Sequence, residues 1–365
     1  AHGYQISNYG YPPLQCQLRE FVTAEYSLSP RESQRSDWEC AVSANGTRAK
    51  MADYARLLRD EYAAKRQPVL ISLAPSWDYH GVFEAEGYKT HFINLSPLDS
   101  FSPNVEEILA GIDLITKDAS LAPMFALNPQ QNPTGVNWTQ DTVDRILEEL
   151  VQRDIPLLLD DAHFSTLNIS EEPTKALRTV LKLAEGTSYR WLHVRSLGKQ
   201  FGCNGWGIGV VCGPTKLLES LLSEYSSERH YNINGLAQYA FSRFLLTEDA
   251  SDYTLRRRKL ISQTRQQFCD LLESELGFPS FFRASCTNFQ LFPVPQRYQV
   301  PEGVLEFVKR SVLEAGVLFT SAWPLPYDSS NLARYDFARV YLTPTENAMI
   351  DAVDRLKKIG MYYDA

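Results

Sequence analysis

Short runs of apolar residues recur through the first two thirds of the chain, and they have the length of buried strands. The runs are Pro68–Leu73, Met124–Leu127, Pro156–Leu159, Trp191–Val194 and Ile208–Cys212. Strands that are apolar on both faces are typical of a parallel sheet that is covered by helices on each side. The pattern therefore predicts a large parallel sheet in this part of the chain.

The segments between these runs have the periodicity of helices. In Thr142–Gln152 the apolar residues recur every three or four positions and share one helical face. Thr139 is a suitable N-cap for this helix, because its hydroxyl oxygen can accept from a free backbone N–H. Strands that alternate with helices indicate a doubly wound α/β domain, in which ligands bind beyond the carboxyl ends of the strands.

The pattern changes after Leu246. A long charged helix is expected over Asp252–Leu276, and it is followed by helical pieces that alternate with strands at Thr287–Phe292 and Arg339–Leu342. A chain of 365 residues is long enough for two domains. We therefore expect a large domain over residues 25–248 and a smaller α/β domain over residues 249–365, which begins with the long connecting helix.

The composition excludes several classes of protein. Hydrophobic residues make up 44% and charged residues 22% of the chain, as in soluble globular proteins. The formal charge of −8 disfavours a nucleic-acid binder, and no apolar run approaches the roughly 18 residues of a membrane helix. Six cysteines without a CxxC pair, and a first decapeptide without a signal pattern, favour a cytoplasmic location and no metal site.

Two ionisable residues follow predicted strands at the edge where a ligand would lie. Lys199 comes after the run that ends at Val194, and a deprotonated lysine amine can form a Schiff base with an aldehyde cofactor. Asp160 ends another run, so its carboxylate emerges at the same edge of the sheet. Taken singly, each has an ordinary explanation, as a surface lysine after a strand or an acid that caps a turn.

Two loops carry groups that bind polar ligands. Asn132 lies in the loop NPQQNPTG, directly after the run that ends at Leu127, and its amide can donate to an oxygen. Gly46 and Thr47 precede a predicted helix, whose first backbone N–H groups are free to bind a phosphate. A loop rich in Asn, Pro and Gly is equally an ordinary turn.

The order of these motifs resembles that of the class I/II aminotransferases of pyridoxal-phosphate (PLP) fold type I. That family has a GT-type phosphate turn, an aromatic residue in a PxW/Y segment, then NPTG, DxAY and SxxK. The chain has Asn45-Gly46-Thr47, Pro75-Ser76-Trp77, Asn132-Pro133-Thr134-Gly135, Asp160-Asp161-Ala162-His163 and Ser196-Leu197-Gly198-Lys199. The resemblance covers nearly the whole chain, and the ordered set is far more specific than any single motif.

The resemblance implies a role for each matching residue. Lys199 is similar to the lysine that holds PLP and acts as the base at the substrate α-carbon. Asp160 is similar to the partner of the pyridine nitrogen, Trp77 to the aromatic that stacks on the ring, and Asn132 to the residue that contacts the phenolic oxygen and the substrate. The residues that resemble the phosphate cup are Gly46, Thr47 and Ser196.

The two ends of the chain extend the resemblance. Arg339, in the segment FARVYL, is similar to the arginine that binds the substrate α-carboxylate, and its planar fork suits a bidentate pair. A strand-edge arginine in a surface ion pair is the alternative. Tyr9, within an arm over residues 1–24, is similar to a tyrosine that reaches the phosphate of the neighbouring subunit. The resemblance therefore implies a homodimer.

Two positions depart from the family. His163 replaces a tyrosine that donates to the cofactor phenolate; either a neutral imidazole donates there as well, or the ring only packs. Gly207 replaces an arginine that binds the phosphate. A charge-assisted hydrogen bond of this kind contributes roughly 1.5–3 kcal/mol, so we expect weaker PLP binding or a substitute cation. Arg48 and Arg195 are the candidates for that substitute.

These departures favour specialised chemistry. In its overall sequence pattern the chain resembles a branch of the family that processes arginine and hydroxyarginine. This branch includes capreomycidine synthase, enduracididine-forming cyclases and PLP-dependent arginine hydroxylases. That branch carries an N-terminal histidine above the cofactor, for which His2 is the candidate. The acid that would bind the guanidinium stays open, and position alone suggests Asp78 or Asp161. We thus expect dehydration and cyclisation of a hydroxyarginine-type amino acid in natural-product biosynthesis. The alternatives are an aminotransferase with an oxo-acid acceptor, an arginine oxidase, or a catalytically silent binding module.

Overall fold

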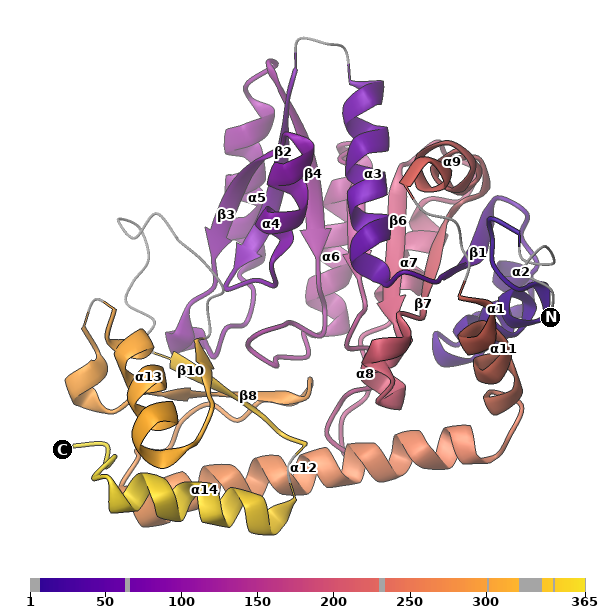
Figure 1. Cartoon of the computed structure of the whole chain (residues 1–365). Helices are drawn as coiled ribbons and strands as arrows, with labels where there is room; N and C mark the ends of the chain where they lie inside the picture. Colours follow the sequence, from indigo (N-terminus) through magenta and orange to yellow (C-terminus); the bar gives the residue numbers. More distant parts are fainter. Residues whose placement is uncertain are drawn as a thin grey trace.

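The fold was analysed in a computed structural model, which describes residues 7–62, 66–229, 234–300, 302–321, 337–343 and 345–364. Two sheets organise these residues, a large one of seven strands and a small one of three (Figure 1). Each sheet has its own hydrophobic core, which agrees with two domains.

The large sheet is mainly parallel. Its strands are β1 (Trp38–Ser43), β2 (Gln67–Ala74), β3 (Lys89–Asn94), β4 (Leu121–Leu127), β5 (Leu157–Asp160), β6 (Trp191–Ser196) and β7 (Gly209–Pro214), in the order β1-β7-β6-β5-β4-β2-β3. The pairs of β7 with β1 and β6 are antiparallel, and all other pairs in this sheet are parallel. The five strands predicted from apolar runs are all present, with ends shifted by up to three residues. The reversal of β7 and the strands β1 and β3 were not predicted.

Helices cover both faces of this sheet, as a doubly wound fold requires. The helices of the large domain are α1 (Pro12–Glu25), α2 (Pro30–Ser33), α3 (Thr47–Glu61), α4 (Tyr79–Phe83), α5 (Val105–Thr116), α6 (Gln140–Gln152), α7 (Ala176–Leu183), α8 (Leu197–Phe201), α9 (Thr215–Ser220), α10 (Ser227–Arg229) and α11 (Gly235–Phe244). One face packs against α3, α4 and α9. The opposite face packs against α1, α5, α6 and α7. The predicted fold class is therefore confirmed.

Helix α6 shows why the sequence pattern located this layer. Val143, Ile146, Leu147 and Leu150 are buried, and they form the apolar stripe of this helix. The hydroxyl of Thr139 accepts from the backbone N–H of Thr142, as expected of an N-cap. The stripe and the cap together fix both the start of the helix and the face that it turns to the sheet.

The small domain follows a single long helix. This is α12 (Asp249–Leu276), which runs along the bottom of Figure 1 from below α11 to the small sheet. The small sheet has the order β8-β10-β9, and its elements are β8 (Phe289–Pro293), β9 (Thr320–Ser321) and β10 (Phe337–Tyr341), with α13 (Gly303–Ala315) and α14 (Glu346–Lys358). An aromatic cluster that includes Phe268, Phe292, Phe307 and Phe319 fills its core.

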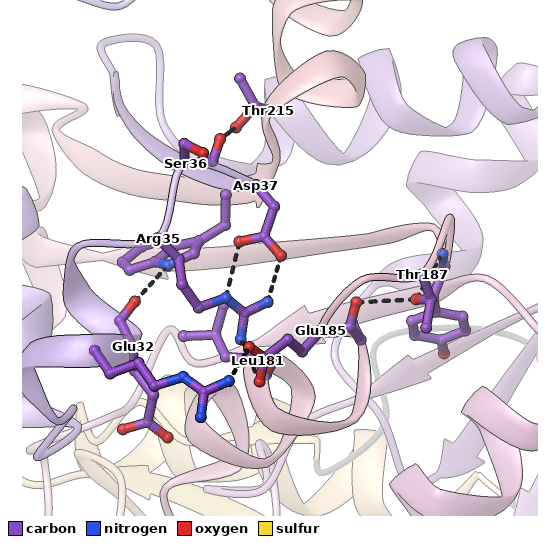
Figure 2. A network of polar contacts seen from close by, with 12 residues as sticks. Glu32, Arg35, Ser36, Asp37, Leu181, Glu185, Thr187 and Thr215 are labelled. Carbon is purple, nitrogen blue, oxygen red and sulfur yellow. Dashed lines mark hydrogen bonds and ion pairs between the residues drawn. The ribbon is translucent and has the colours of Figure 1, made fainter.

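Residues 35–37, which precede β1, make hydrogen bonds and an ion pair within the large domain (Figure 2). Arg35 donates to both carboxylate oxygens of Asp37 and to the carbonyl of Leu181 at the end of α7. The hydroxyl of Thr215 donates to the carbonyl of Ser36 at 2.7 Å. These bonds place β1 at the edge of the sheet, next to β7. Among the described helices, none is both long and apolar enough to cross a membrane.

Candidate active site

A cavity of about 120 Å³ lies at the carboxyl ends of the central strands. Its walls come from the loops after β2, β4 and β5, from the start of α3, and from the end of β6 with α8. The lining residues are Thr47, Met51, Trp77, Asn128, Asn132, Asp160, Ala162, His163, Ser196 and Lys199. Segments far apart in the sequence thus meet at the edge where the sequence predicted a ligand.

Asp160 is a buried carboxylate that is held by neutral donors. Its Oδ2 accepts from the hydroxyl of Tyr79 at 2.6 Å, and its Oδ1 accepts from the backbone N–H of Ala162 at 2.9 Å. Burial raises the pKa of Asp160 to about 6, although both hydrogen bonds and the amine of Lys199 act in the opposite direction. The carboxylate is therefore ready to pair with a cationic ligand group.

Lys199 lies on the short helix α8 and reaches the same cavity. Among the described residues no hydrogen bond or ion pair engages its amine. Burial and the guanidinium of Arg339 lower the pKa of Lys199 from its usual value, while Asp160 has the opposite effect. A lowered pKa increases the fraction of neutral amine, which is the nucleophilic and basic form.

His163 is a buried, neutral base in the same wall. Burial, with the cationic Lys199 and Arg339 nearby, lowers the pKa of His163 to about 3. Its Nδ1 lies 3.3 Å from the hydroxyl of Thr166, and its ring contacts Phe289 edge-on with centroids 6.0 Å apart. The ring therefore stays uncharged across the physiological pH range.

Arg339 connects the small domain to the cavity. It lies on β10, and its Nη1 donates to the side-chain oxygen of Asn132 at 3.1 Å. Its Nε donates to the hydroxyl of Thr320 at 3.1 Å, and its guanidinium lies 4.3 Å from the centre of the Phe289 ring. Among the described residues no acid pairs with this guanidinium, which is half-buried, so these contacts favour a role at the cavity over the alternative of a surface ion pair.

The loop after β1 and the end of β6 form the opposite wall. Thr47 begins α3, whose first backbone N–H groups lack intrahelical partners, and Ser196 precedes α8. The N–H of Leu197, the first residue of α8, already donates to the carbonyl of Ile208 at 3.2 Å. The N–H of Gly46 is not free, because it donates to the carbonyl of Gly207 at 2.7 Å. Gly207 has a φ of +63°, and a Cβ there would lie 3.3 Å from the carbonyl oxygen of Ala44.

The two arginines considered as substitutes for the missing cation differ in position. Arg48, in the first turn of α3, binds Asp78 at 2.5 Å and lies 5.1 Å from the centre of the Trp77 ring. Arg195 does not face the cavity. It precedes Ser196 in an extended strand, so its side chain points to the opposite face of the sheet.

A buried polar network occupies that opposite face. Arg195 donates to Glu25 at 2.8 Å and to Gln200 at 2.6 Å, and its guanidinium lies 4.4 Å from the centre of the Phe164 ring. The strand alternation that separates Arg195 from Ser196 also separates Asp161 from Asp160. This network therefore lies across the sheet from Ser196 and Asp160, which line the cavity.

Asp161 belongs to this network and not to the cavity. Its Oδ2 accepts from the hydroxyl of Tyr26 at 2.5 Å and lies 3.1 Å from Nε2 of His193. All three side chains are buried. The proposal that Asp161 binds a substrate guanidinium is therefore wrong. Strand alternation was the signal that would have placed Asp161 and Arg195 correctly.

The remaining predicted residues lie at the rim or beyond it. Trp77 lines the cavity and contacts Tyr79 edge-on, with centroids 5.3 Å apart. Tyr9 does not line the cavity of its own chain, and its carbonyl accepts from the N–H of Val42 at 2.9 Å. His2 lies outside the described residues.

Comparisons with known proteins agree with this geometry. The profile of a family described as "Aminotransferase class I and II" matches residues 9–348. An aspartate aminotransferase of Sulfolobus acidocaldarius is 21% identical over 359 residues, which cover 96% of this chain and 81% of that protein. An LL-diaminopimelate aminotransferase of Halothermothrix orenii is 25% identical over 74% of this chain and 65% of that protein.

A probable aspartate/prephenate aminotransferase of Thermus aquaticus is 26% identical over 192 residues, so the chain matches only 44% of the length of that relative. Among solved structures, an aspartate aminotransferase from Thermus thermophilus has a TM-score of 0.77 at 21% identity, covering 97% of this chain and 83% of that one. An N-succinyldiaminopimelate aminotransferase from Mycobacterium tuberculosis has a TM-score of 0.76 at 20% identity, covering 97% and 85%. These likenesses show the fold.

Proposed function

We propose that this chain, a PLP-dependent enzyme that belongs to the class I and II aminotransferases, transfers the amino group of a free L-amino acid to an oxo acid. The observation that carries this proposal is the pairing of Asp160 and Lys199 in one cavity. The first is a buried carboxylate with neutral partners only, and the second is an amine without a partner among the described residues.

The residues of the cavity fit PLP. A pyridinium N–H would give Asp160 the cationic partner that its burial calls for, and the amine of Lys199 is available for the aldehyde carbon. Trp77 offers a ring face, and Asn132 an amide for the phenolic oxygen. When bound, PLP supplies a ring that withdraws electrons from the substrate α-carbon.

The phosphate end fits with one change from the expectation. Because the N–H of Gly46 is already used by Gly207, the backbone donors left are those that begin α3 at Thr47, together with the hydroxyl of Ser196. Arg48 is the cation that we propose in place of the family's arginine. It follows Thr47 in α3 and lies over Trp77, which lines the cavity, and exchange of Asp78 for a phosphate would keep it ion-paired.

The other residues orient the substrate and move its proton. Lys199 would remove the substrate α-proton, and its lowered pKa favours the neutral amine that this requires. Arg339 would bind the α-carboxylate through the guanidinium donors that its bonds to Thr320 and Asn132 leave free. Binding of the carboxylate fixes the α-hydrogen near the base.

Transamination fits better than the hydroxyarginine cyclisation that the sequence favoured. The relatives named above are aminotransferases. Both acids considered for a substrate guanidinium have other partners, because Asp161 lies across the sheet and Asp78 pairs with Arg48. Arginine oxidation requires the same guanidinium contact. These activities become alternative outcomes of the experiment below.

We also propose a homodimer in the cytoplasm. Large apolar side chains are exposed near Tyr9 and the loop that follows α8: Trp206 is 44%, Leu236 83% and Tyr239 45% exposed. Tyr239 lies 6.1 Å from Tyr11, centre to centre, so α11 and the N-terminal segment form one surface. A second copy that covers it would bring Tyr9 to its neighbour's phosphate end.

The test is turnover with and without an acceptor. Purified protein loaded with PLP is incubated with a panel of L-amino acids, including arginine and γ-hydroxyarginine, and products are followed by mass spectrometry. We expect one turnover per site without an oxo acid, and multiple turnovers after addition of 2-oxoglutarate or pyruvate. Lys199→Ala is the inactive control. Multiple turnovers without an acceptor, with loss of one water from hydroxyarginine, would instead establish cyclisation.

A further inference from the structure

His163 occupies the position where the family has a tyrosine, and a neighbouring hydroxyl decides which of its nitrogens carries the proton. The Oγ1 of Thr166 lies 2.6 Å from the backbone carbonyl oxygen of His163 itself. A carbonyl has no hydrogen, so at this distance the single hydroxyl hydrogen must lie between the two oxygens. Thr166 is buried, so water does not compete for this bond.

The same hydroxyl oxygen lies 3.3 Å from Nδ1 of His163. Because its hydrogen is committed to the carbonyl, the oxygen can offer Nδ1 only a lone pair. An attractive contact then requires the hydrogen to be on Nδ1. The ring is neutral, since burial and the cations Lys199 and Arg339 lower the pKa of His163 to about 3, and a neutral imidazole has one N–H only.

The other nitrogen, Nε2, makes no hydrogen bond with any described residue, and the ring lines the cavity. We infer that Thr166 fixes His163 as the Nδ1–H tautomer, so that His163 presents a hydrogen-bond acceptor to the cavity where a tyrosine presents a donor. The edge contact with Phe289 hinders rotation of the ring into another orientation. Thr166 is thus a positioning residue that acts through His163.

The tautomer changes what the cavity stabilises, if the proposed PLP chemistry is right. A hydrogen-bond donor beside the phenolic oxygen of PLP stabilises the phenolate anion. A hydrogen-bond acceptor at the same place instead favours the form in which a neighbouring group keeps its proton. Among the described residues, the charged or titratable groups near this position are Lys199, Asp160 and Arg339, and none of these supplies a donor to that oxygen in the way that a tyrosine does. The proton of the Lys199–PLP linkage should therefore be held to higher pH than a donor would allow.

The first experiment measures the tautomer in the PLP-free protein. The chain has six histidines, so ¹⁵N-histidine labelling and long-range ¹H–¹⁵N spectra resolve each ring, and His163→Gln identifies its signals. We expect the Nδ1–H pattern for His163, its loss in Thr166→Val, and its retention in Thr166→Ser. An Nε2–H pattern in the unmodified protein overturns the inference. An Nδ1–H pattern that persists in Thr166→Val overturns it as well.

The second experiment titrates the absorbance of the Lys199–PLP linkage with pH. His163→Tyr should lower the pKa of the linkage by roughly 1 to 2, the difference that one charge-assisted hydrogen bond makes. Thr166→Val should lower it in the same direction, because the freed ring can then donate through Nε2, while Thr166→Ser should leave it unchanged. Equal pKa values for His163→Tyr and the unmodified protein would contradict the inference.

The two experiments separate this inference from the proposed function. The tautomer is measured without PLP, so it stands or falls independently of transamination. A protein with the Nδ1–H pattern that turns over without an oxo acid would refute only the proposed function. Melting temperatures of the Thr166 and His163 variants serve as the folding control, and a variant that fails to fold is replaced by the serine or glutamine change at the same position.

Discussion

Replacing Asp160 by asparagine should stabilise the PLP-free protein at neutral pH while it impairs the loaded enzyme. The carboxyl group ionises near pH 3.8 in an unfolded chain, and its pKa is raised to about 6 in the fold by burial. Between these pH values the folded protein therefore binds a proton that the unfolded chain has released. Stability falls as the pH rises through this window, and the loss is complete above about pH 6.

The size of the effect follows from the two pKa values. A pKa difference of about 2 between the folded and unfolded chain corresponds to about 3 kcal/mol. Ionised Asp160 lowers the free energy of unfolding of the PLP-free protein by this amount at pH 7.5. Asparagine avoids this cost, but it has one acceptor oxygen where the carboxylate uses two, for Tyr79 and Ala162. The lost bond costs roughly 1 kcal/mol. We therefore expect Asp160→Asn to be more stable by about 2 kcal/mol at pH 7.5 and less stable near pH 4.

The assay is urea unfolding of the PLP-free protein, followed by tryptophan fluorescence at several pH values between 4 and 8. The stability curves of Asp160→Asn and the unmodified protein should cross between pH 4 and 6. Asp99→Asn, at an exposed turn, is the control and should leave the curve unchanged. Parallel curves for Asp160→Asn and the unmodified protein would refute the reasoning. Added PLP should stabilise the unmodified protein more than the variant, because only a carboxylate pairs with the pyridinium.

Three further changes test other parts of the site. Arg339→Lys should lower kcat/KM by roughly 10- to 100-fold without a change in melting temperature, because lysine cannot pair with a carboxylate bidentately; steady-state kinetics measures this. Arg48→Ala should weaken PLP binding by about 10-fold in equilibrium dialysis, whereas Arg31→Ala, at an exposed position outside the cavity lining, should not. Arg195→Met should lower the free energy of unfolding by about 2–3 kcal/mol, because it leaves the half-buried carboxylate of Glu25 without its cation. Burial raises the pKa of Glu25, but Arg195 and hydrogen bonds from Ser165 and Gln200 lower it overall. The penalty in Arg195→Met should therefore shrink at acid pH, where Glu25 becomes protonated.

The sequence predicted the parts of the site that depend on strand ends. Lys199 and Asp160 follow apolar runs, and parallel strands bring their carboxyl ends to one edge, so their meeting could be expected without coordinates. The approach of Arg339 to Asn132 joins residues 207 positions apart. Only the resemblance to a family indicated that contact, because hydrophobic periodicity carries no information on which distant loops meet.

Other features of the site depend on side-chain directions that no motif encodes. The hydrogen bond from Tyr79 to Asp160 and the contact between Thr166 and His163 were not predicted, since both arise from the way the loops fold back. Arg195 was misplaced for a different reason. The apolar run ended at Val194, and the strand was assumed to end there, whereas β6 continues to Ser196 and turns Arg195 to the far face.

The place of β1 at the edge of the sheet has a consequence for the order in which the protein can fold during synthesis. Among the described strands β1 pairs only with β7, so residues 38–43 wait for residues 209–214. The strand β5, which ends at Asp160, adjoins β4 and β6, which precede Asn132 and Lys199, so these three strands can associate earlier. Pairings between distant segments form late, because closing a long loop is entropically costly. We therefore expect the turn at Thr47, which would receive the phosphate, to reach its final position only after the ribosome has passed Pro214. A shorter nascent chain would contain most of the cavity residues, but β1 would lack the strand with which it pairs, and the phosphate end would stay incomplete.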